Sequence, residues 1–335
     1  MNRIDGPGAV DIHGHYVIPA LLKREGATDN WRYEARMEED GSVLLTRGSD
    51  SVPCFYQPTD LEQIVENMDL LGIQTMAINV APFQMGYELD PKIGTEVARI
   101  ANNTLAEACA AHPGRFVGMG TLPMQDVPSA ITELEWLIGS GMVGVQLGSN
   151  VNGVYLGDEH FRPVWQAISD VDAAVFVHPV NLIGADRLAD YFLANLIGNP
   201  VDTTRCIADV IFSGLLDENS GLKICFAHAG GAAPYLVGRW DHGYLKRTKA
   251  RGRISRLPSD YLKMLYFDSI AHSEKALRFL IDLVGSEQVM IGTDYPFDMG
   301  PDRPVRFIDD ASSLTGEDKR LITSQNARRF LGLDP

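Results

Sequence analysis

The sequence predicts an α/β fold in which eight parallel strands and the helices between them form a (β/α)8 TIM barrel. Short, continuously apolar runs alternate with helical patterns along nearly all of the 335 residues. Such runs are typical of parallel strands that are covered on both faces. Eight strands alternating with helices favour a closed barrel over an open doubly wound sheet. Because no Pro- or Ser-rich linker divides the chain, we expect a single domain over residues 1–335.

Each predicted strand is an apolar run with a helical pattern or a loop on either side. The predicted strands are Ala9–His13, Met76–Ala81, Phe116–Leu122, Gly144–Leu147, Ala173–His178, Leu222–Ala227, Met264–Ser269 and Val289–Thr293. The first predicted helix has Asp60 as its N-cap and ends at Gly72, with apolar residues at helical spacing. The others are Lys92–Ala111, Pro128–Ile138, Phe161–Ser169, Asp202–Leu216, Ser273–Leu283 and Gly316–Leu331.

Two segments depart from this alternation, and both follow a predicted strand. Residues 16–58 have a mixed, charged sequence, with a possible hairpin at Glu39–Ser42 before Val43–Leu45. Residues 181–200 carry a short helical pattern. Long segments that follow barrel strands lie at the carboxyl ends of those strands, where they can cover an active site. We therefore expect residues 16–58 to be a small insertion near the mouth of the barrel.

Composition and charge exclude several classes of protein. Asp and Glu number 44 against 29 Lys and Arg, which gives a formal net charge of −15. A chain this acidic is repelled by phosphate backbones and anionic lipid, so we expect no nucleic-acid or membrane partner. No run of eighteen apolar residues and no secretory signal is present, and the four cysteines form no CxxC pair. These features predict a cytoplasmic protein with reduced thiols.

The most informative feature is where the histidines fall. His13 and His15 close the first predicted strand as Asp11-Ile12-His13-Gly14-His15. On an extended backbone the two imidazoles point to the same side, about 7 Å apart along the strand. That geometry suits two nitrogen ligands on one divalent metal ion.

Three further metal-binding side chains follow other predicted strands. His178 ends the fifth strand and His228 follows the sixth, while Asp294 follows the last. A barrel brings the carboxyl ends of its strands around one mouth, so the side chains should converge there. The sequence therefore predicts one metal centre built from four histidines and one aspartate.

These residues occur in the order of a known family. The chain resembles the metal-dependent amidohydrolases, in particular the branch of α-amino-β-carboxymuconate-ε-semialdehyde decarboxylase and related non-oxidative decarboxylases. The motifs that carry the resemblance span residues 11 to 297, and together they are specific to the branch. They are Asp11-Ile12-His13-Gly14-His15, Val177-His178-Pro179, Ile224-Cys225-Phe226-Ala227-His228-Ala229-Gly230-Gly231, Gly238-Arg239 and Gly292-Thr293-Asp294-Tyr295-Pro296-Phe297.

The resemblance implies a mononuclear site for Zn²⁺, with Mn²⁺ as the alternative found in other members. His13, His15, His178 and Asp294 would be its ligands. His228 would be the acid/base group beside metal-bound water, and Asp294 could share in the proton transfer. The same resemblance implies a homodimer.

Two further residues take substrate-binding roles from the resemblance. Arg239 would bind a substrate carboxylate, sometimes across the dimer, although its spacing alone is equally consistent with a structural salt bridge. Phe297 resembles an aromatic residue that lines the family's substrate pocket.

The chain departs from the muconate-semialdehyde decarboxylases in the first insertion. Those enzymes carry a second substrate-binding arginine just before a Pro-x-Tyr-Gln segment. Here the segment reads Ser51-Val52-Pro53-Cys54-Phe55-Tyr56-Gln57, and the nearest arginine is Arg47. The sequence therefore predicts the branch and leaves the individual substrate open.

We therefore expect a metal-dependent carboxy-lyase acting on a small aromatic or unsaturated carboxylic acid. The alternative is a metal-dependent hydrolase of a small amide, lactone or ester, because the same centre can activate water. A hydratase is a third enzymatic alternative. A catalytically silent barrel is a different class of protein, which metal binding by the purified protein would exclude.

Overall fold

The computed structural model describes residues 8–23, 31–39, 42–48, 50–54 and 59–333. Its centre is an eight-stranded parallel sheet, and the strands of this sheet confirm all eight predicted ones. In sheet order they are β1 (Ala9–Tyr16), β5 (Ile73–Val80), β6 (Phe116–Thr121), β7 (Gly144–Gly148), β10 (Ala174–His178), β11 (Lys223–Phe226), β12 (Tyr266–Asp268) and β13 (Val289–Met290). The main differences are at the ends, since β1 runs on to Tyr16 and β13 stops at Met290.

The sheet closes into a barrel between β1 and the segment that follows β13. The Ile12 amide donates to the Ile291 carbonyl at 3.0 Å, and the Asp294 amide donates to the His13 carbonyl at 2.7 Å. The His15 amide then donates to the Tyr295 carbonyl, also at 2.7 Å. These bonds confirm the predicted (β/α)8 barrel, and they fix the segment around Asp294 against the end of β1.

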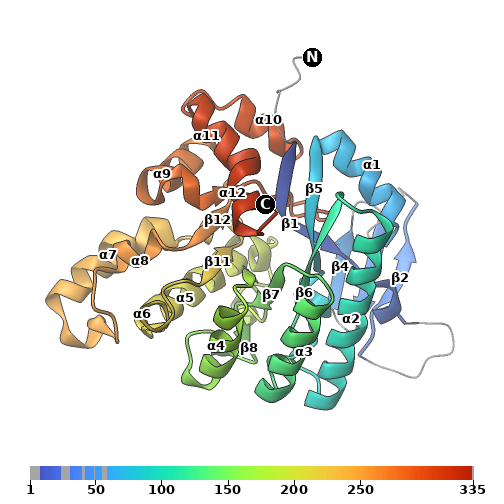
Figure 1. Cartoon of the computed structure of the whole chain (residues 1–335), viewed down its shortest axis with the longest axis horizontal. Helices are drawn as coiled ribbons and strands as arrows, with labels where there is room; N and C mark the ends of the chain where they lie inside the picture. The colour runs from blue at the N-terminus through green and yellow to red at the C-terminus, as the bar shows by residue number, and fades with distance from the viewer. Residues whose placement is uncertain (1–7, 24–30, 40–41, 49, 55–58, 334–335) are drawn as a thin grey trace.

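Helices surround the barrel in Figure 1, and α7 and α8 lie at the left of that view. The main helices are α1 (Leu61–Leu71), α2 (Pro91–Ala111), α3 (Val127–Gly139), α4 (Arg162–Asp170), α5 (Asn199–Phe212), α7 (Ala233–Lys246) and α9 (Glu274–Val284). Shorter ones are α6 (Leu215–Glu218), α8 (Pro258–Leu262), α10 (Pro304–Asp309), α11 (Gly316–Arg320) and α12 (Asn326–Phe330).

The first helix shows the predicted caps. The Asp60 carboxylate accepts hydrogen bonds from the amides of Glu62 and Gln63 at the start of α1. Gly72 ends α1 with a φ of 79°, a left-handed conformation that glycine adopts without strain.

Two predicted helices are interrupted in the structure. The prediction for Asp202–Leu216 is corrected because Gly214, with a φ of 80°, separates α5 from α6. The prediction for Gly316–Leu331 is corrected because a π-helical turn, Leu321–Gln325, lies between α11 and α12.

The barrel interior is apolar below the strand ends that carry the histidines. Residues facing inward from the strands form one buried cluster with Phe330 and Leu331 at the C-terminal end of α12. Its strand residues are Val10, Ile12, Ala77, Met119, Ala174, Phe176, Cys225, Ala227 and Met290. Each fully buried large apolar side chain contributes about 1.5–3 kcal/mol. This packed interior holds the strand ends, and hence the residues of the site, in fixed positions.

A small antiparallel sheet lies within the predicted insertion. It consists of β2 (Glu34–Met37), β3 (Val43–Arg47) and β4 (Asp50–Cys54). The β2–β3 pairing agrees with the expected hairpin, although Asp40 and Gly41 lie outside the described residues. Leu45 and Cys54 pack with barrel residues in one buried cluster. We therefore propose that residues 16–58 are an insertion within one barrel domain.

No helix in the described ranges combines the length and apolar character that crossing a membrane requires. The cysteines Cys54, Cys109, Cys206 and Cys225 are free thiols.

Candidate metal centre

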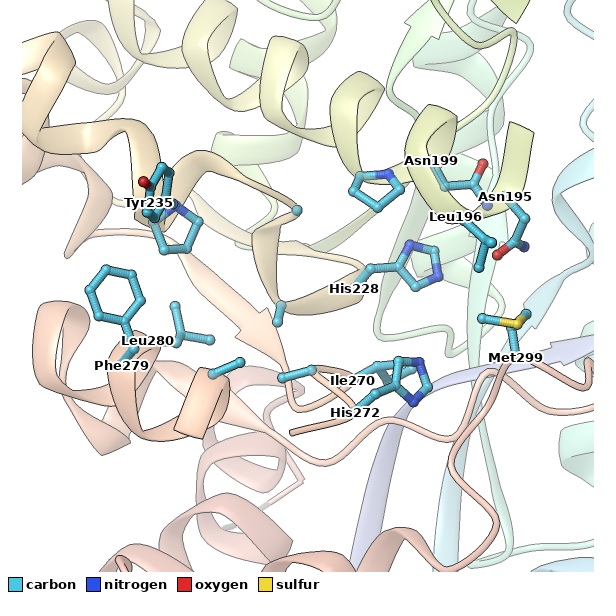
Figure 2. A pocket seen from close by; sticks show the side chains of 16 residues that line it. Asn195, Leu196, Asn199, His228, Tyr235, Ile270, His272, Phe279, Leu280 and Met299 are labelled. Carbon is cyan, nitrogen blue, oxygen red and sulfur yellow. The ribbon is translucent and has the colours of Figure 1, made fainter. Parts of the chain in front are cut away.

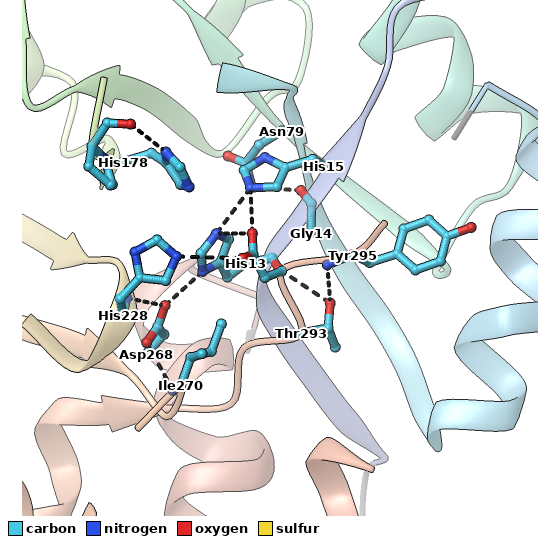
Figure 3. Close-up of polar contacts among 12 residues, drawn as sticks. His13, Gly14, His15, Asn79, His178, His228, Asp268, Ile270, Thr293 and Tyr295 are labelled. Carbon is cyan, nitrogen blue, oxygen red and sulfur yellow. Dashed lines mark hydrogen bonds and ion pairs between the residues drawn. The ribbon is translucent and has the colours of Figure 1, made fainter. Parts of the chain in front are cut away.

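The structure brings the five predicted metal-binding side chains together at the carboxyl end of the barrel, where Figure 3 shows the four histidines. His13 and His15 lie on β1, and His178 is the last residue of β10. His228 lies two residues after the last residue of β11, and Asp294 lies beyond β13. His13 and His15 are fully buried, whereas the His228 side chain retains 15% exposure.

Their nitrogen and oxygen atoms converge on one point. His13 Nε2 lies 3.0 Å from His15 Nε2 and 3.1 Å from Asp294 Oδ1. His15 Nε2 lies 3.3 Å from the same carboxylate oxygen. One ligand atom from each of His13, His178, His228 and Asp294 lies within 4.8 Å of the other three.

Three of the histidines are oriented by hydrogen bonds from their other ring nitrogen. His13 Nδ1 donates to Asp268 Oδ2 at 2.7 Å, and His178 Nδ1 donates to the Pro179 carbonyl at 2.9 Å. His15 Nδ1 lies 3.3 Å from the Val80 carbonyl. Donation from Nδ1 leaves the lone pair of Nε2 available to a cation, as in most protein metal sites.

His228 differs from these three histidines. Its Nδ1 is buried and has no hydrogen-bond partner among the described residues. Its Nε2 lies 3.5 Å from Asp294 Oδ2, the carboxylate oxygen that does not approach His13 and His15. His228 is thus the least constrained of the four imidazoles.

The backbone at two of these residues is strained. His228 has a φ of 55° and Asp294 a φ of 54°, which lie in the left-handed region that residues with a side chain rarely adopt. Such positions cost on the order of 1–3 kcal/mol each and cluster at functional sites. Hydrogen bonds hold both backbone conformations. The Asp294 amide donates to the His13 carbonyl, and the His228 amide donates to the Asp268 carboxylate at 2.8 Å.

Asp268 is the site residue that the sequence analysis missed. This buried carboxylate ends β12 and accepts from His13 Nδ1 and from the amides of His228, Ala229 and Ile270. The signal that could have found it is the one that found Asp294, an acidic residue at the carboxyl end of a predicted strand.

The charges of the site are strongly coupled. Burial opposes protonation of His13, but the carboxylates of Asp294 and Asp268 raise its pKa to about 10. Burial lowers the pKa of His15 to about 4 and lowers that of His178 as well. Burial alone would raise the pKa of Asp294, but the imidazole of His13 holds it well below its usual value. An ionised carboxylate among imidazoles is a donor set that a divalent cation fits.

The centre opens into a cavity of about 670 Å³. His178, His228 and Asp294 line its inner end, and Phe297 contributes to its wall. Phe297 also contacts His15, with 5.5 Å between ring centroids. Arg47 from the insertion, the arginine nearest in sequence to the position where the muconate-semialdehyde decarboxylases carry theirs, lines this cavity too.

His228 also lines a second cavity, of about 440 Å³ (Figure 2). Tyr235 on α7 and Phe279 on α9 belong to its mainly apolar wall. Arg239 is exposed on α7 and lines neither cavity, so the structure does not bring it to the site of its own chain.

The family model described as amidohydrolase matches residues 10–333. The chain belongs to the amidohydrolase family. A 2-amino-3-carboxymuconate-6-semialdehyde decarboxylase from Dictyostelium discoideum is 33% identical, over 97% of this chain and 92% of the relative. A gamma-resorcylate decarboxylase from Rhizobium sp. is 30% identical, over 80% of this chain and 85% of the relative. These relatives place this amidohydrolase in the decarboxylase branch.

The fold agrees with this placement. The structure of 5-carboxyvanillate decarboxylase from Sphingomonas paucimobilis superposes with a TM-score of 0.81 at 26% identity. That likeness covers 97% of this amidohydrolase and 98% of the other chain.

We expect Asp268→Asn to weaken metal binding by this amidohydrolase about 10- to 100-fold, as loss of an outer partner does elsewhere. If the side-chain nitrogen of the new asparagine took the place of Oδ2, it would face two hydrogen-bond donors, His13 Nδ1 and the His228 amide, and could accept from neither. If the side chain flipped, the nitrogen would instead face the amides of Ala229 and Ile270. Competition with a chromogenic chelator measures the metal affinity.

The matched control is Asp202→Asn, because Asp202 is equally buried but bonds to Tyr155 and Ser149 instead of a histidine. That variant should lose stability without a selective loss of metal. Equal metal affinity in Asp268→Asn and the wild type would remove Asp268 from the centre.

Proposed function

We propose that this amidohydrolase is a metal-dependent, non-oxidative decarboxylase of small aromatic or unsaturated carboxylic acids. The observation that carries the proposal is the convergence of His13, His178, His228 and Asp294, with His15 in contact with His13 and Asp294, beside a ligand-sized cavity. The decarboxylases among its relatives support the reaction class.

His13, His15, His178 and Asp294 would hold the metal, with Zn²⁺ as the first candidate and Mn²⁺ as the alternative. Nitrogen and carboxylate donors are compatible with both ions. The three oriented Nδ1 groups support this choice of histidine ligands. When bound, such an ion polarises the oxygen atoms of the substrate.

His228 is left for proton transfer, because its side chain is partly exposed and faces both cavities. It delivers a proton to the carbon that bears the carboxylate. The bond between that carbon and the carboxylate then breaks, and its electron pair restores the unsaturated system as carbon dioxide leaves. Asp294 Oδ2, 3.5 Å from His228 Nε2, can assist this proton transfer.

The substrate carboxylate needs a cationic partner, and Arg239 would supply it from the second subunit of a homodimer. Its exposed place on α7 supports this arrangement, since the side chain is not used within its own chain's cavities. Phe297 would stack on the substrate from the cavity wall. We also propose a cytoplasmic location, which the free thiols favour.

The direct test is to measure carbon dioxide release from a panel of hydroxylated benzoic acids by the metal-loaded protein. Release with a stoichiometric decarboxylated product is expected. A new carboxylate formed from an ester, lactone or amide, with no gas from any acid, would instead identify a hydrolase. Absence of both activities and of bound metal would identify a silent barrel.

A further inference from the structure

The far end of the larger cavity holds an arginine that is already paired. Arg47 is the only Lys or Arg among the described residues that line this cavity. Its Nη1 lies 2.7 Å from Glu88 Oε1, and Glu88 lines the same cavity. The guanidinium also lies 4.5 Å from the centroid of the Tyr33 ring. Arg47 is therefore fixed in place with its charge balanced by Glu88.

This pairing determines which substituents the far end of the cavity accepts. A second substrate carboxylate at Arg47 would have to displace Glu88 or lie beside it, and like charges side by side are unfavourable. Asp298, another lining residue, adds negative charge to the cavity. Among the described residues of its own chain, the cavity thus offers a second carboxylate no cation that is not already paired, because the Arg239 proposed from the second subunit binds the carboxylate that is lost.

Neutral hydrogen-bonding groups are available nearer to the metal centre. Asn195 lies in the π-helical turn Ala194–Gly198 and Asn199 is the first residue of α5, and both line the two cavities together with His228 (Figure 2). Neither side chain has a hydrogen-bond partner among the described residues. A carboxamide can both donate to and accept from a phenolic hydroxyl.

We propose that the substrate is a hydroxylated aromatic monocarboxylate whose remaining substituents are uncharged. This inference rests on the proposed decarboxylase function and narrows its substrate class. Asn195 and Asn199 bind ring hydroxyls, and the Arg47–Glu88 pair excludes a second carboxylate. The substrate therefore differs in charge from dicarboxylic acids such as 5-carboxyvanillate.

The test compares two acids of similar size in carbon dioxide release. One is 5-carboxyvanillate, and the other is its derivative with the carboxylate that is para to the hydroxyl converted to a carboxamide. For the wild type we expect kcat/KM to be about tenfold or more higher for the carboxamide. Glu88→Gln leaves Arg47 unbalanced, so it should shift that ratio about two- to fivefold toward the diacid.

Two control variants make the shift specific. Glu88→Asp keeps the negative charge and should retain the wild-type preference. Glu135→Gln removes an exposed carboxylate on α3, away from the cavity, and should change neither rate. A wild type that uses both acids equally, with no shift in Glu88→Gln, would overturn the proposal.

The asparagines have a separate test. We expect Asn199→Leu to lower kcat/KM for 2,6-dihydroxybenzoate about two- to tenfold more than for 2-hydroxybenzoate, because only the former has a second hydroxyl. Equal losses for the two acids would remove Asn199 from hydroxyl recognition. If no acid in either comparison releases carbon dioxide, the proposed function itself fails, which is distinct from a wrong charge preference.

Discussion

His228→Ala is expected to keep its metal and to lose turnover by a factor of about 10² to 10⁴, the usual contribution of a general acid/base. The reason is that the three other histidines and Asp294 are still present to bind the metal. The variant lacks only the partly exposed imidazole of His228, which lies beside Asp294 Oδ2. Metal content by elemental analysis and kcat for carbon dioxide release measure the two effects.

The control for this variant is His160→Ala, since His160 is exposed and lies outside both cavities. That change should leave metal content and kcat unaltered. Full activity in His228→Ala would remove His228 from the mechanism, and loss of the metal would make it a ligand instead.

Asp294→Ala is expected to weaken metal binding by at least about 100-fold, more than loss of an outer partner such as Asp268 does. Among the described residues, only the Asp294 carboxylate approaches the Nε2 atoms of both His13, at 3.1 Å, and His15, at 3.3 Å. Activity should fall with the metal. Isothermal titration with Zn²⁺ and with Mn²⁺ measures the affinity, and Asp302→Ala, an exposed carboxylate elsewhere, is the control.

Metal binding should also depend on pH in a defined direction. Burial lowers the pKa of His13, but the charges of Asp294 and Asp268 outweigh burial and raise this pKa to about 10. Protons therefore compete with the cation for Nε2 of His13. Affinity should therefore increase as pH increases, and a chelator should strip the metal more readily at pH 6 than at pH 8. An Asp294→Ala variant that binds the metal as tightly as the wild type would contradict this account. An affinity that decreases as the pH increases would contradict it too.

The barrel and its metal centre could be predicted because both depend on local pattern and topology. Apolar runs predicted the eight strands, and His13, His178 and Asp294 could be placed together because parallel strands end at one edge of a barrel. The helix breaks at Gly214 and at Leu321–Gln325 depend on backbone geometry that apolar spacing does not reveal.

The less predictable residues act through contacts between distant segments. The Arg47–Glu88 pair joins the insertion to the loop after β5, and no spacing in the sequence indicates it. Asp268 could have been predicted in the same way as Asp294, because both are acidic residues at the carboxyl end of a predicted strand. Its hydrogen bond to His13, 255 residues away, is not indicated by any spacing in the sequence. The role of Arg239 depends on a second subunit, so neither its spacing nor the structure of one chain determines it.

The central claim is that one divalent ion binds where the five side chains converge. Anomalous diffraction from crystals of the metal-loaded protein, recorded across the zinc and manganese absorption edges, tests it most directly. We predict a single peak about 2.0–2.2 Å from Nε2 of His13, His15 and His178 and from an oxygen of Asp294. A fully loaded protein whose anomalous peak lies away from these atoms would contradict the account.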